Sequence, residues 1–290
     1  MKKPITTLML FLSGFLLFGQ IEIPYLGYNH APTIYNPASS ANTGSFMGHL
    51  SYQDYWVGFQ DSPEALNLNL FGNITENMGI GINVNRTSIH IFNQTLLDAS
   101  YAYRVQPHSD AWLSFGLSLG IRRLNAVQSN NAMDEYEPVL DGIFFDETLY
   151  TTGFGISYHW KGLSLDLAAP DIYRDSEFFE KYMAVLAYRF ALSPDISMRP
   201  MAMYRKFSPV AEDYQFRLET GFKDLVFLEL GYGNDVNVIA GLGFAFGGFR
   251  IGYYYSSLNT YLSNVASGSN SIWLRYQLFD PLKTEIAEEK

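Results

Sequence analysis

Residues 113–120 read Leu113-Ser114-Phe115-Gly116-Leu117-Ser118-Leu119-Gly120. Large apolar residues occupy every second position of this stretch, and small or polar residues occupy the positions between them. Because successive side chains of a strand point to opposite faces, the pattern predicts a β-strand with one apolar face and one small, polar face. Such a strand suits a sheet that separates a hydrophobic environment from a polar one.

The same alternation recurs along most of the chain. It predicts about fourteen strands, an even number, as is typical of bacterial outer-membrane barrels. Short and long connections also alternate between them, with one exception at residues 233–235. The expected strands cover residues 46–57, 65–72, 78–88, 94–105, 111–122, 150–159, 163–168, 181–190, 195–205, 212–221, 224–232, 236–246, 249–256 and 271–279.

The composition favours a membrane sheet over a soluble one. Charged residues make up 17% of the chain, below the roughly 25% of an ordinary soluble domain. After residue 20, no apolar run approaches the roughly 20 residues of a transmembrane helix. Hydrocarbon offers no hydrogen-bond partners, so a β-rich membrane chain must close into a cylinder. We therefore predict an all-β fold, a transmembrane antiparallel up-and-down β-barrel; a soluble β-sandwich is the alternative.

Aromatic residues supply a further sign of a membrane barrel. They make up 16% of the chain, and many lie near the ends of the expected strands. Outer-membrane barrels carry aromatic girdles at both lipid interfaces. The residues expected there are Tyr52, Tyr55, Trp56, Tyr101, Tyr103, Trp160 and Trp273.

Four segments are predicted along the chain. Lys2 and Lys3 precede an apolar stretch that is typical of a signal peptide, so residues 1–19 are expected to be cleaved. Residues 20–45 are predicted to form a periplasmic or plug segment against the barrel mouth. The barrel itself spans residues 46–279, and the polar residues 280–290 are predicted to form a periplasmic tail. The protein would then be integral to the outer membrane, with both barrel termini in the periplasm.

The charge balance and the residue types exclude several function classes. The formal net charge is −10, which disfavours nucleic-acid binding. The chain has no cysteine, so disulfides and thiolate–metal sites are excluded. No arrangement of serine, histidine and acid with the spacing of a hydrolase is visible. We expect neither an enzyme nor a cofactor.

Arginines interrupt several of the expected strands. An arginine on the lipid face near the bilayer midplane costs about 2–4 kcal/mol, so these side chains are expected in the lumen or at the rims. Their expected partners are Asp98, Asp166, Glu219 and Glu229. The predicted lumen arginines are Arg86, Arg104, Arg122, Arg217, Arg250 and Arg275.

One long outward connection, residues 129–149, contains six carboxylates and no Lys or Arg. Clustered oxygen ligands suit Ca²⁺, although the spacing does not match an EF-hand loop. The alternative is a solvated loop whose charges keep it extended. The candidate metal ligands are Asp134, Glu135, Glu137 and Asp141.

Several short motifs follow one another in a characteristic order. They are Tyr35-Asn36-Pro37-Ala38, Trp56-Val57-Gly58-Phe59, Tyr101-Ala102-Tyr103-Arg104, Ala169-Pro170-Asp171 and a stretch rich in Gly and Tyr at residues 241–255. In this order the chain resembles the PorP/SprF family of Bacteroidetes outer-membrane proteins, over nearly the whole mature sequence. It departs from the family pattern at Ser269-Asn270-Ser271, where the family has Ser-His-Glu.

The resemblance implies a role in type IX secretion and gliding motility. Proteins of this family help cargo proteins with a dedicated C-terminal domain, such as a gliding adhesin, to reach the cell surface and remain attached to it. The implied partners also include a periplasmic secretion ring, peptidoglycan-binding lipoproteins and outer-membrane lipids. A channel or transporter for small hydrophobic molecules is the alternative function. The motif residues implied in binding are Asn36, Pro37, Ala38, Trp56, Gly58 and Phe59.

Overall fold

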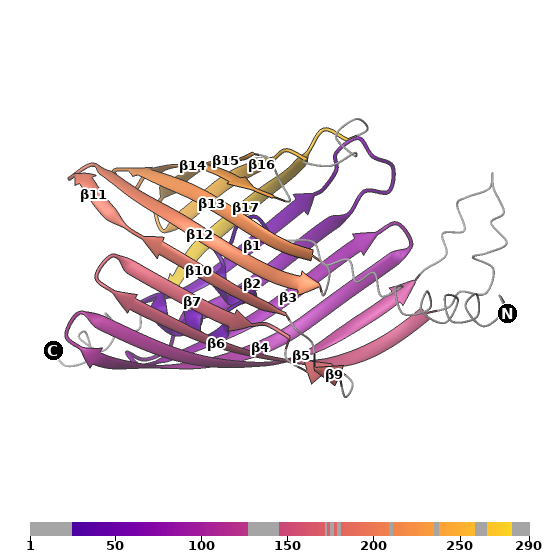
Figure 1. Ribbon diagram of the computed structural model, residues 1–290, viewed down its shortest axis with the longest axis horizontal. Helices are drawn as coiled ribbons and strands as arrows, with labels where there is room; N and C mark the ends of the chain where they lie inside the picture. The colour runs from indigo at the N-terminus through magenta and orange to yellow at the C-terminus, as the bar shows by residue number, and fades with distance from the viewer. Residues whose placement is uncertain are drawn as a thin grey trace, which may run out of the picture.

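The computed structural model describes residues 25–126, 145–171, 173–174, 177–178, 181–208, 211–234, 238–258 and 266–279. One large antiparallel sheet dominates it (Figure 1). Its strands are β1 (Phe46–Asp54), β2 (Glu64–Asn73), β3 (Met78–Ile89), β4 (Phe92–His108), β5 (Ala111–Ala126), β6 (Phe145–Trp160), β7 (Leu163–Ala169), β10 (Tyr182–Tyr188), β11 (Phe190–Ser193), β12 (Ile196–Ser208), β13 (Ala211–Phe222), β14 (Val226–Gly233), β15 (Ile239–Phe246), β16 (Phe249–Ser256) and β17 (Ser269–Phe279). A separate small hairpin joins β8 (Tyr173–Arg174) to β9 (Glu177–Phe178).

The sheet closes into a barrel because its first and last strands pair with each other. β1 pairs with β17 on one side and with β2 on the other. β10 and β11 are separated by Arg189 alone and both pair with β12, so they form one crossing. The fifteen strands of the sheet therefore make fourteen crossings of an up-and-down barrel, with neighbours in the barrel also neighbours in sequence. The predicted fold class is confirmed.

The strand boundaries agree with the predicted ones to within three residues except at β5 and β6. Those strands were expected to end at residue 122 and to begin at residue 150, but they continue to Ala126 and start at Phe145. Their backbone pairing runs on from Arg122–Leu149 to Ala126–Phe145. Residues 123–126 and 145–149 lack the alternation of apolar and polar residues that predicts a strand. The strands continue through them because ladder hydrogen bonds join backbone groups and do not require alternating side chains.

The two ends of the barrel differ in their connections. At one end, called here the short-turn end, tight turns connect the strands, as at Gly247–Gly248 between β15 and β16. Both glycines have positive φ, +53° and +85°, which is the backbone of a two-residue hairpin turn. The opposite end, called the loop end, carries the longest connections, such as that between β1 and β2. The expected alternation of short and long connections also fails between β3 and β4, which only two residues join at this end.

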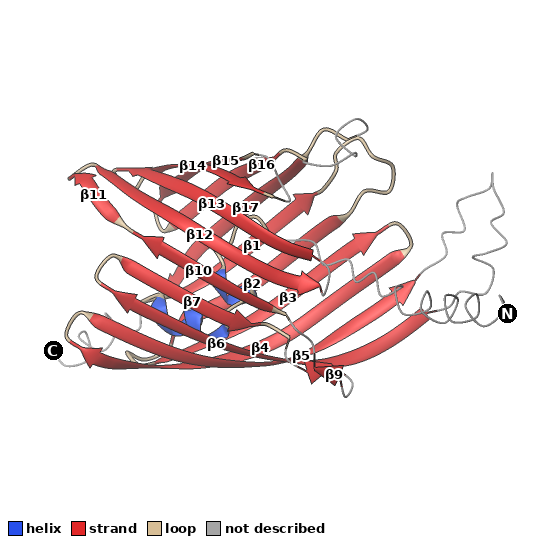
Figure 2. Cartoon of the chain, in the orientation of Figure 1, coloured by secondary structure: helices blue, strands red, loops and turns tan. Residues whose placement is uncertain are grey.

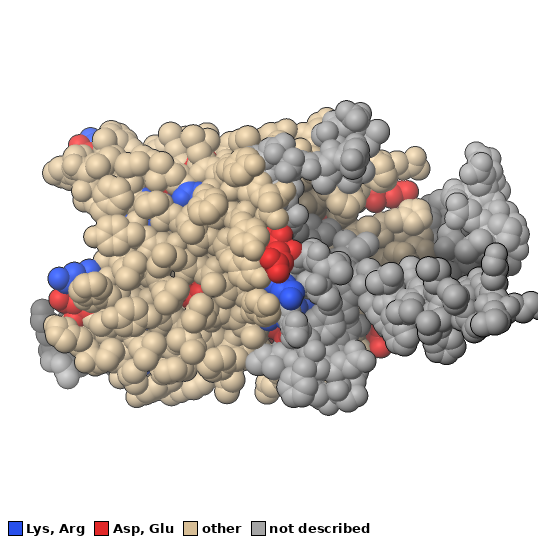
Figure 3. Space-filling view, viewed as in Figure 1, with Lys and Arg blue, Asp and Glu red and all other residues tan. Residues whose placement is uncertain are grey.

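The outer face of the barrel is apolar. Leucines that alternate along one strand, such as Leu117 and Leu119, are 62% and 68% exposed. On the face drawn in Figure 3, charged side chains gather mainly toward the ends. Such an outer band is suited to lipid.

The aromatic girdle is confirmed in part. Tyr52, Tyr101, Tyr103 and Trp160 are exposed on the outer face, as predicted. Tyr55 and Trp273 are buried, so their assignment to the girdle was wrong. Trp273 points inward because it has the opposite parity to the exposed Ile272 and Leu274 in β17.

Residues 25–45, called here the lumen segment, lie inside the barrel. They include two short 3-10 helices, η1 (Pro32–Ile34) and η2 (Pro37–Asn42), drawn in blue in Figure 2. Every residue of the segment is buried or half-buried. The aromatic rings of Tyr28 and Tyr35 cover an apolar part of the inner wall formed by Met183, Val185, Ala187, Met201 and Met203.

A row of small residues in the barrel wall receives η2. Gly79, Ala102, Gly116, Gly155 and Ala168 are register partners across five neighbouring strands. A Cβ atom added to Gly116 would lie 2.2 Å from the Ala38 nitrogen, and one added to Gly79 would lie 2.4 Å from the Ala41 nitrogen. Only glycine at these places lets the backbone of the lumen segment come so close to the wall.

Among the described residues, no helix has the length and apolar character needed to cross a membrane.

Candidate functional site

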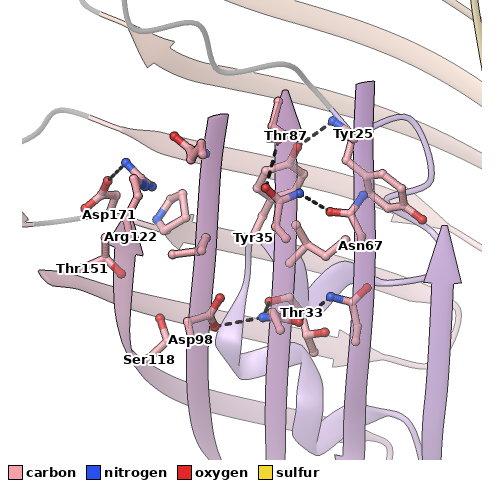
Figure 4. A pocket seen from close by; sticks show the side chains of 18 of the residues that line it. Tyr25, Thr33, Tyr35, Asn67, Thr87, Asp98, Ser118, Arg122, Thr151 and Asp171 are labelled. Atoms are coloured by element: carbon pink, nitrogen blue, oxygen red, sulfur yellow. Dashed lines mark hydrogen bonds and ion pairs between the residues drawn. The ribbon is translucent and has the colours of Figure 1, made fainter. Parts of the chain in front are cut away.

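The main cavity lies between the lumen segment and the loop-end half of the wall (Figure 4). Its space, counted together with the open solvent at its mouth, is about 960 Å³. Tyr25, Thr33 and Tyr35 of the lumen segment form part of its boundary. The rest of the lining comes from the loop-end halves of neighbouring strands and is rich in amides: Gln53, Asn67, Asn69, Asn83, Asn85 and Gln94.

The asparagines of β2 and β3 form a hydrogen-bonded ladder along this wall. They face inward because they alternate with exposed residues such as Leu66 and Leu68. The Asn69 amide donates to Asn83 Oδ1 over 2.7 Å, and the Asn85 amide donates to Asn67 Oδ1 over 2.5 Å. Asn83 in turn donates to Asp98 and to the backbone carbonyl of the lumen segment. This part of the cavity wall is thus a polar surface made mainly of uncharged amides.

Three charged groups form a buried cluster at one side of the cavity. An Arg122 Nη1 lies 3.0 Å from Asp171 Oδ2, and the Lys181 Nζ lies 3.6 Å from the same oxygen. All three side chains are at most 7% exposed. Buried charges need compensation, and this cluster supplies it between the end of β5 and the segment that joins β7 to β10. Figure 4 shows Arg122 and Asp171 facing each other across the edge of the cavity.

Asn36 anchors the lumen segment beneath this cavity. Its side-chain amide donates to Asp166 Oδ1 over 3.2 Å and to Ser157 Oγ over 3.0 Å. Its side-chain oxygen accepts from the Ala38 nitrogen over 3.0 Å, which caps η2. One asparagine therefore both starts the 3-10 helix and ties it to the wall. Asn36, Pro37 and Ala38 are buried inside the lumen.

The other motif residues lie at the rim of the loop end. Trp56, Gly58 and Phe59 belong to the connection between β1 and β2, and the Phe59 side chain is 43% exposed. The Trp56 and Phe59 rings meet edge to face at 6.4 Å. The Val57 nitrogen donates to the Gly268 carbonyl over 2.8 Å, so this connection is fastened to the segment that precedes β17. The structure separates the two halves of the motif set: one is internal and the other is presented outward.

The predicted lumen arginines fall into three groups. Arg217 forms a buried ion pair with Glu229 at 3.0 Å, and Arg122 pairs as described above. Arg104, Arg250 and Arg275 also have inward parity, and Arg104 lies 4.1 Å above the Trp112 ring. Arg86 differs from the prediction. It is exposed and shares the outer face with Leu66, its register partner, because its parity in β3 is that of Ile82.

His30 fixes the lumen segment on the opposite side of the barrel. Its ring stacks on Trp273 with centroids 3.6 Å apart, and its Nε2 lies 2.8 Å from the hydroxyl of Tyr254. Burial lowers the pKa of His30 well below its usual value, and the nearby Arg275 acts in the same direction. The ring is therefore neutral at ordinary pH and serves as a packing and hydrogen-bonding group.

The metal-site prediction concerns Asp134, Glu135, Glu137 and Asp141, which lie outside the described residues. Within the described part of the chain, no three His, Cys, Asp or Glu residues come together as a metal site would require.

Sequence reasoning missed several residues that shape the site. Lys181 and the pairing of Asp171 with Arg122 were not anticipated, although Asp171 stands in one of the quoted motifs. The row of glycines that receives η2 was not anticipated either. The glycines Gly79, Gly116 and Gly155 lie at the same height in neighbouring strands of the wall. This alignment becomes visible only once the strand register is known.

The sequence of most of the chain matches a known protein family. Residues 17–276 match the sequence profile of the family described as "Type IX secretion system membrane protein PorP/SprF". No curated protein matches the chain.

Solved structures share the fold at low sequence identity. A deletion mutant of the TodX monoaromatic hydrocarbon channel aligns with a TM-score of 0.57 and 11% identity, covering 85% of this chain and 93% of that one. The CymD monoaromatic hydrocarbon channel aligns with a TM-score of 0.51 and 11% identity, covering 87% of this chain and 94% of that one. A FadL homologue of Pseudomonas aeruginosa aligns with a TM-score of 0.50 and 10% identity, covering 84% of this chain and 93% of that one. These likenesses show an outer-membrane barrel fold.

Proposed function

Because the chain belongs to the PorP/SprF family of type IX secretion system membrane proteins, we propose that it binds the C-terminal domain of a cargo protein in the outer membrane and helps its export or surface attachment. The observation that carries the proposal is the filled lumen. Residues 25–45 occupy the barrel and are nowhere fully exposed, which suits a receptor better than an open pore.

The cargo would contact the loop end. In outer-membrane barrels short turns face the periplasm and longer loops face outward, so the rim with Trp56 and Phe59 would be on the cell surface. The amide-lined cavity opens on the same side of the lumen segment. Exposed aromatic side chains are frequent anchors of protein interfaces. The protein would act by binding and not by catalysis.

The same orientation would place both barrel termini in the periplasm. β1 begins and β17 ends at the short-turn end, where Phe46 and Phe279 are register partners. Periplasmic components, such as the secretion ring or peptidoglycan-binding lipoproteins, would meet the barrel there. The outer-membrane lipids would surround the apolar band between the two ends.

A channel for small hydrophobic molecules is the second candidate function. It is supported by the fold shared with structures described as hydrocarbon channels. The polar lining of the main cavity, with its asparagine ladder, disfavours an apolar ligand. The secretion role therefore ranks first.

Co-purification from the native host tests the proposed function. The tagged protein is expected to bring down a surface protein that carries a secretion C-terminal domain, identified by mass spectrometry. Replacing two aromatic anchors by alanine in Trp56→Ala/Phe59→Ala should cost about 2 kcal/mol or more, roughly a 30-fold loss of affinity. Ile74→Ala, which alters an exposed residue at the short-turn end, is the control.

Either of two results would contradict cargo binding at the loop end. If the intact protein retains no such cargo, or if both variants retain it equally, cargo binding at the loop end is wrong.

A further inference from the structure

A second cavity lies at the short-turn end, away from the main one. It is an open hollow of about 660 Å³, counted together with the solvent at its mouth, and is bounded by the Gly247–Gly248 turn and by Met47. Arg250 of β16 and Arg275 of β17 line it and stand directly opposite each other in the strand register. Two positive charges therefore line the same cavity.

Neither arginine has a carboxylate partner within 4 Å among the described residues. Arg250 lies 4.8 Å from the Phe227 ring, and an Arg275 Nη1 donates weakly to the His30 carbonyl over 3.4 Å. Glu219 acts electrostatically on both, but at longer range. Like charges directly opposite each other on a sheet are destabilising. A buried arginine elsewhere in the lumen, Arg217, has an acid in contact.

We infer that Arg250 and Arg275 form an oxyanion site, which takes a phosphate or carboxylate group between the two guanidinium groups. Planar guanidinium forks match the geometry of these anions and bind them through charge-assisted hydrogen bonds. The site is separate from cargo binding at the loop end. Its anion has two possible sources: the acidic residues Glu285, Glu288 and Glu289, which follow the last strand at this end, or a group carried by another molecule.

The test titrates inorganic phosphate into the full-length, detergent-folded protein at low ionic strength, with isothermal calorimetry as the readout. Saturable binding is expected, and Arg250→Gln/Arg275→Gln should weaken it about tenfold or more, since each charged hydrogen bond contributes about 1.5–3 kcal/mol. Arg189→Gln is the control, because Arg189 is exposed at the same end and lies 3.7 Å from Asp224. The single variant Arg250→Gln replaces the double variant if the latter does not fold.

Removal of residues 280–290 distinguishes the two sources. If the truncated chain binds phosphate about tenfold more tightly than the full chain, the tail is the resident anion. If both bind equally, the anion comes from another molecule. Absence of saturable binding to both chains, or equal binding by the arginine variant and the control, overturns the site.

Discussion

Deleting residues 21–43 is expected to convert the protein into an open channel. The lumen segment occupies the interior of a barrel with fourteen crossings. Such an interior is wider than that of an eight-stranded barrel, which side chains fill, and narrower than that of a porin, which conducts. Single-channel conductance in planar bilayers should therefore rise about tenfold or more over that of the intact protein. The polar inner face, including the ladder of Asn69 and Asn83, would line the new water-filled path.

The control for this deletion is removal of residues 280–290, which follow the last strand in the sequence. The deletion variant must first show the heat-dependent change in electrophoretic mobility of a folded barrel. Conductance that equals that of the intact protein, in a folded deletion variant, would show that residues 21–43 do not close the lumen.

Replacing the three wall glycines by alanine is expected to dislodge η2 without removing any residue. In Gly79→Ala/Gly116→Ala/Gly155→Ala the new methyl groups would lie 2.4 Å, 2.2 Å and 1.9 Å from atoms of the lumen segment. Two of these contacts are with backbone, which cannot rotate away. Overpacking costs about 1–3 kcal/mol at each site, enough together to undock the segment. Intermittent channel openings should appear in planar bilayers.

A lipid-facing glycine offers the matched control for this triple variant. A Cβ atom at Gly48 would meet only the side chains of Leu70 and Leu278, at 3.5 Å and 3.8 Å. Gly48→Ala should therefore leave the conductance unchanged. The docking of η2 on the glycine row is refuted if the folded triple variant stays as closed as Gly48→Ala.

The sequence was sufficient to predict the barrel because its signal is local. Alternating residues such as Leu117 and Leu119 report which face meets lipid, and turns such as Gly247–Gly248 punctuate the strands. Each strand can therefore be recognised by itself, and strand number and parity follow. An exception was Arg86, whose parity in its strand was overlooked.

The interior could not be predicted in the same way, because it depends on register. The contact of Asn36 with Asp166 joins residues 130 positions apart. Pairing of Arg122 with Asp171 likewise depends on the place where β7 ends. The resemblance to a family marked Asn36, Pro37 and Ala38 as a motif, but only the structure shows what their side chains touch.

The filled lumen links the fold to the proposed role. With the segment docked, the described part of the chain offers its main cavity and its rim aromatics Trp56 and Phe59 at the loop end. An asparagine, a row of glycines and a neutral histidine hold that arrangement together. Binding at the surface would then need no passage through the barrel.

Cysteine accessibility tests the filled lumen most directly, because the chain has no cysteine of its own. Ser40→Cys places a thiol on η2, where Ser40 is 0% exposed, and Gln60→Cys places one on the exposed loop end. In the folded protein, a water-soluble maleimide should label Ser40→Cys about 100-fold or more slowly than Gln60→Cys, since labelling would require local opening. Labelling of both thiols at comparable rates would contradict a lumen occupied by residues 25–45.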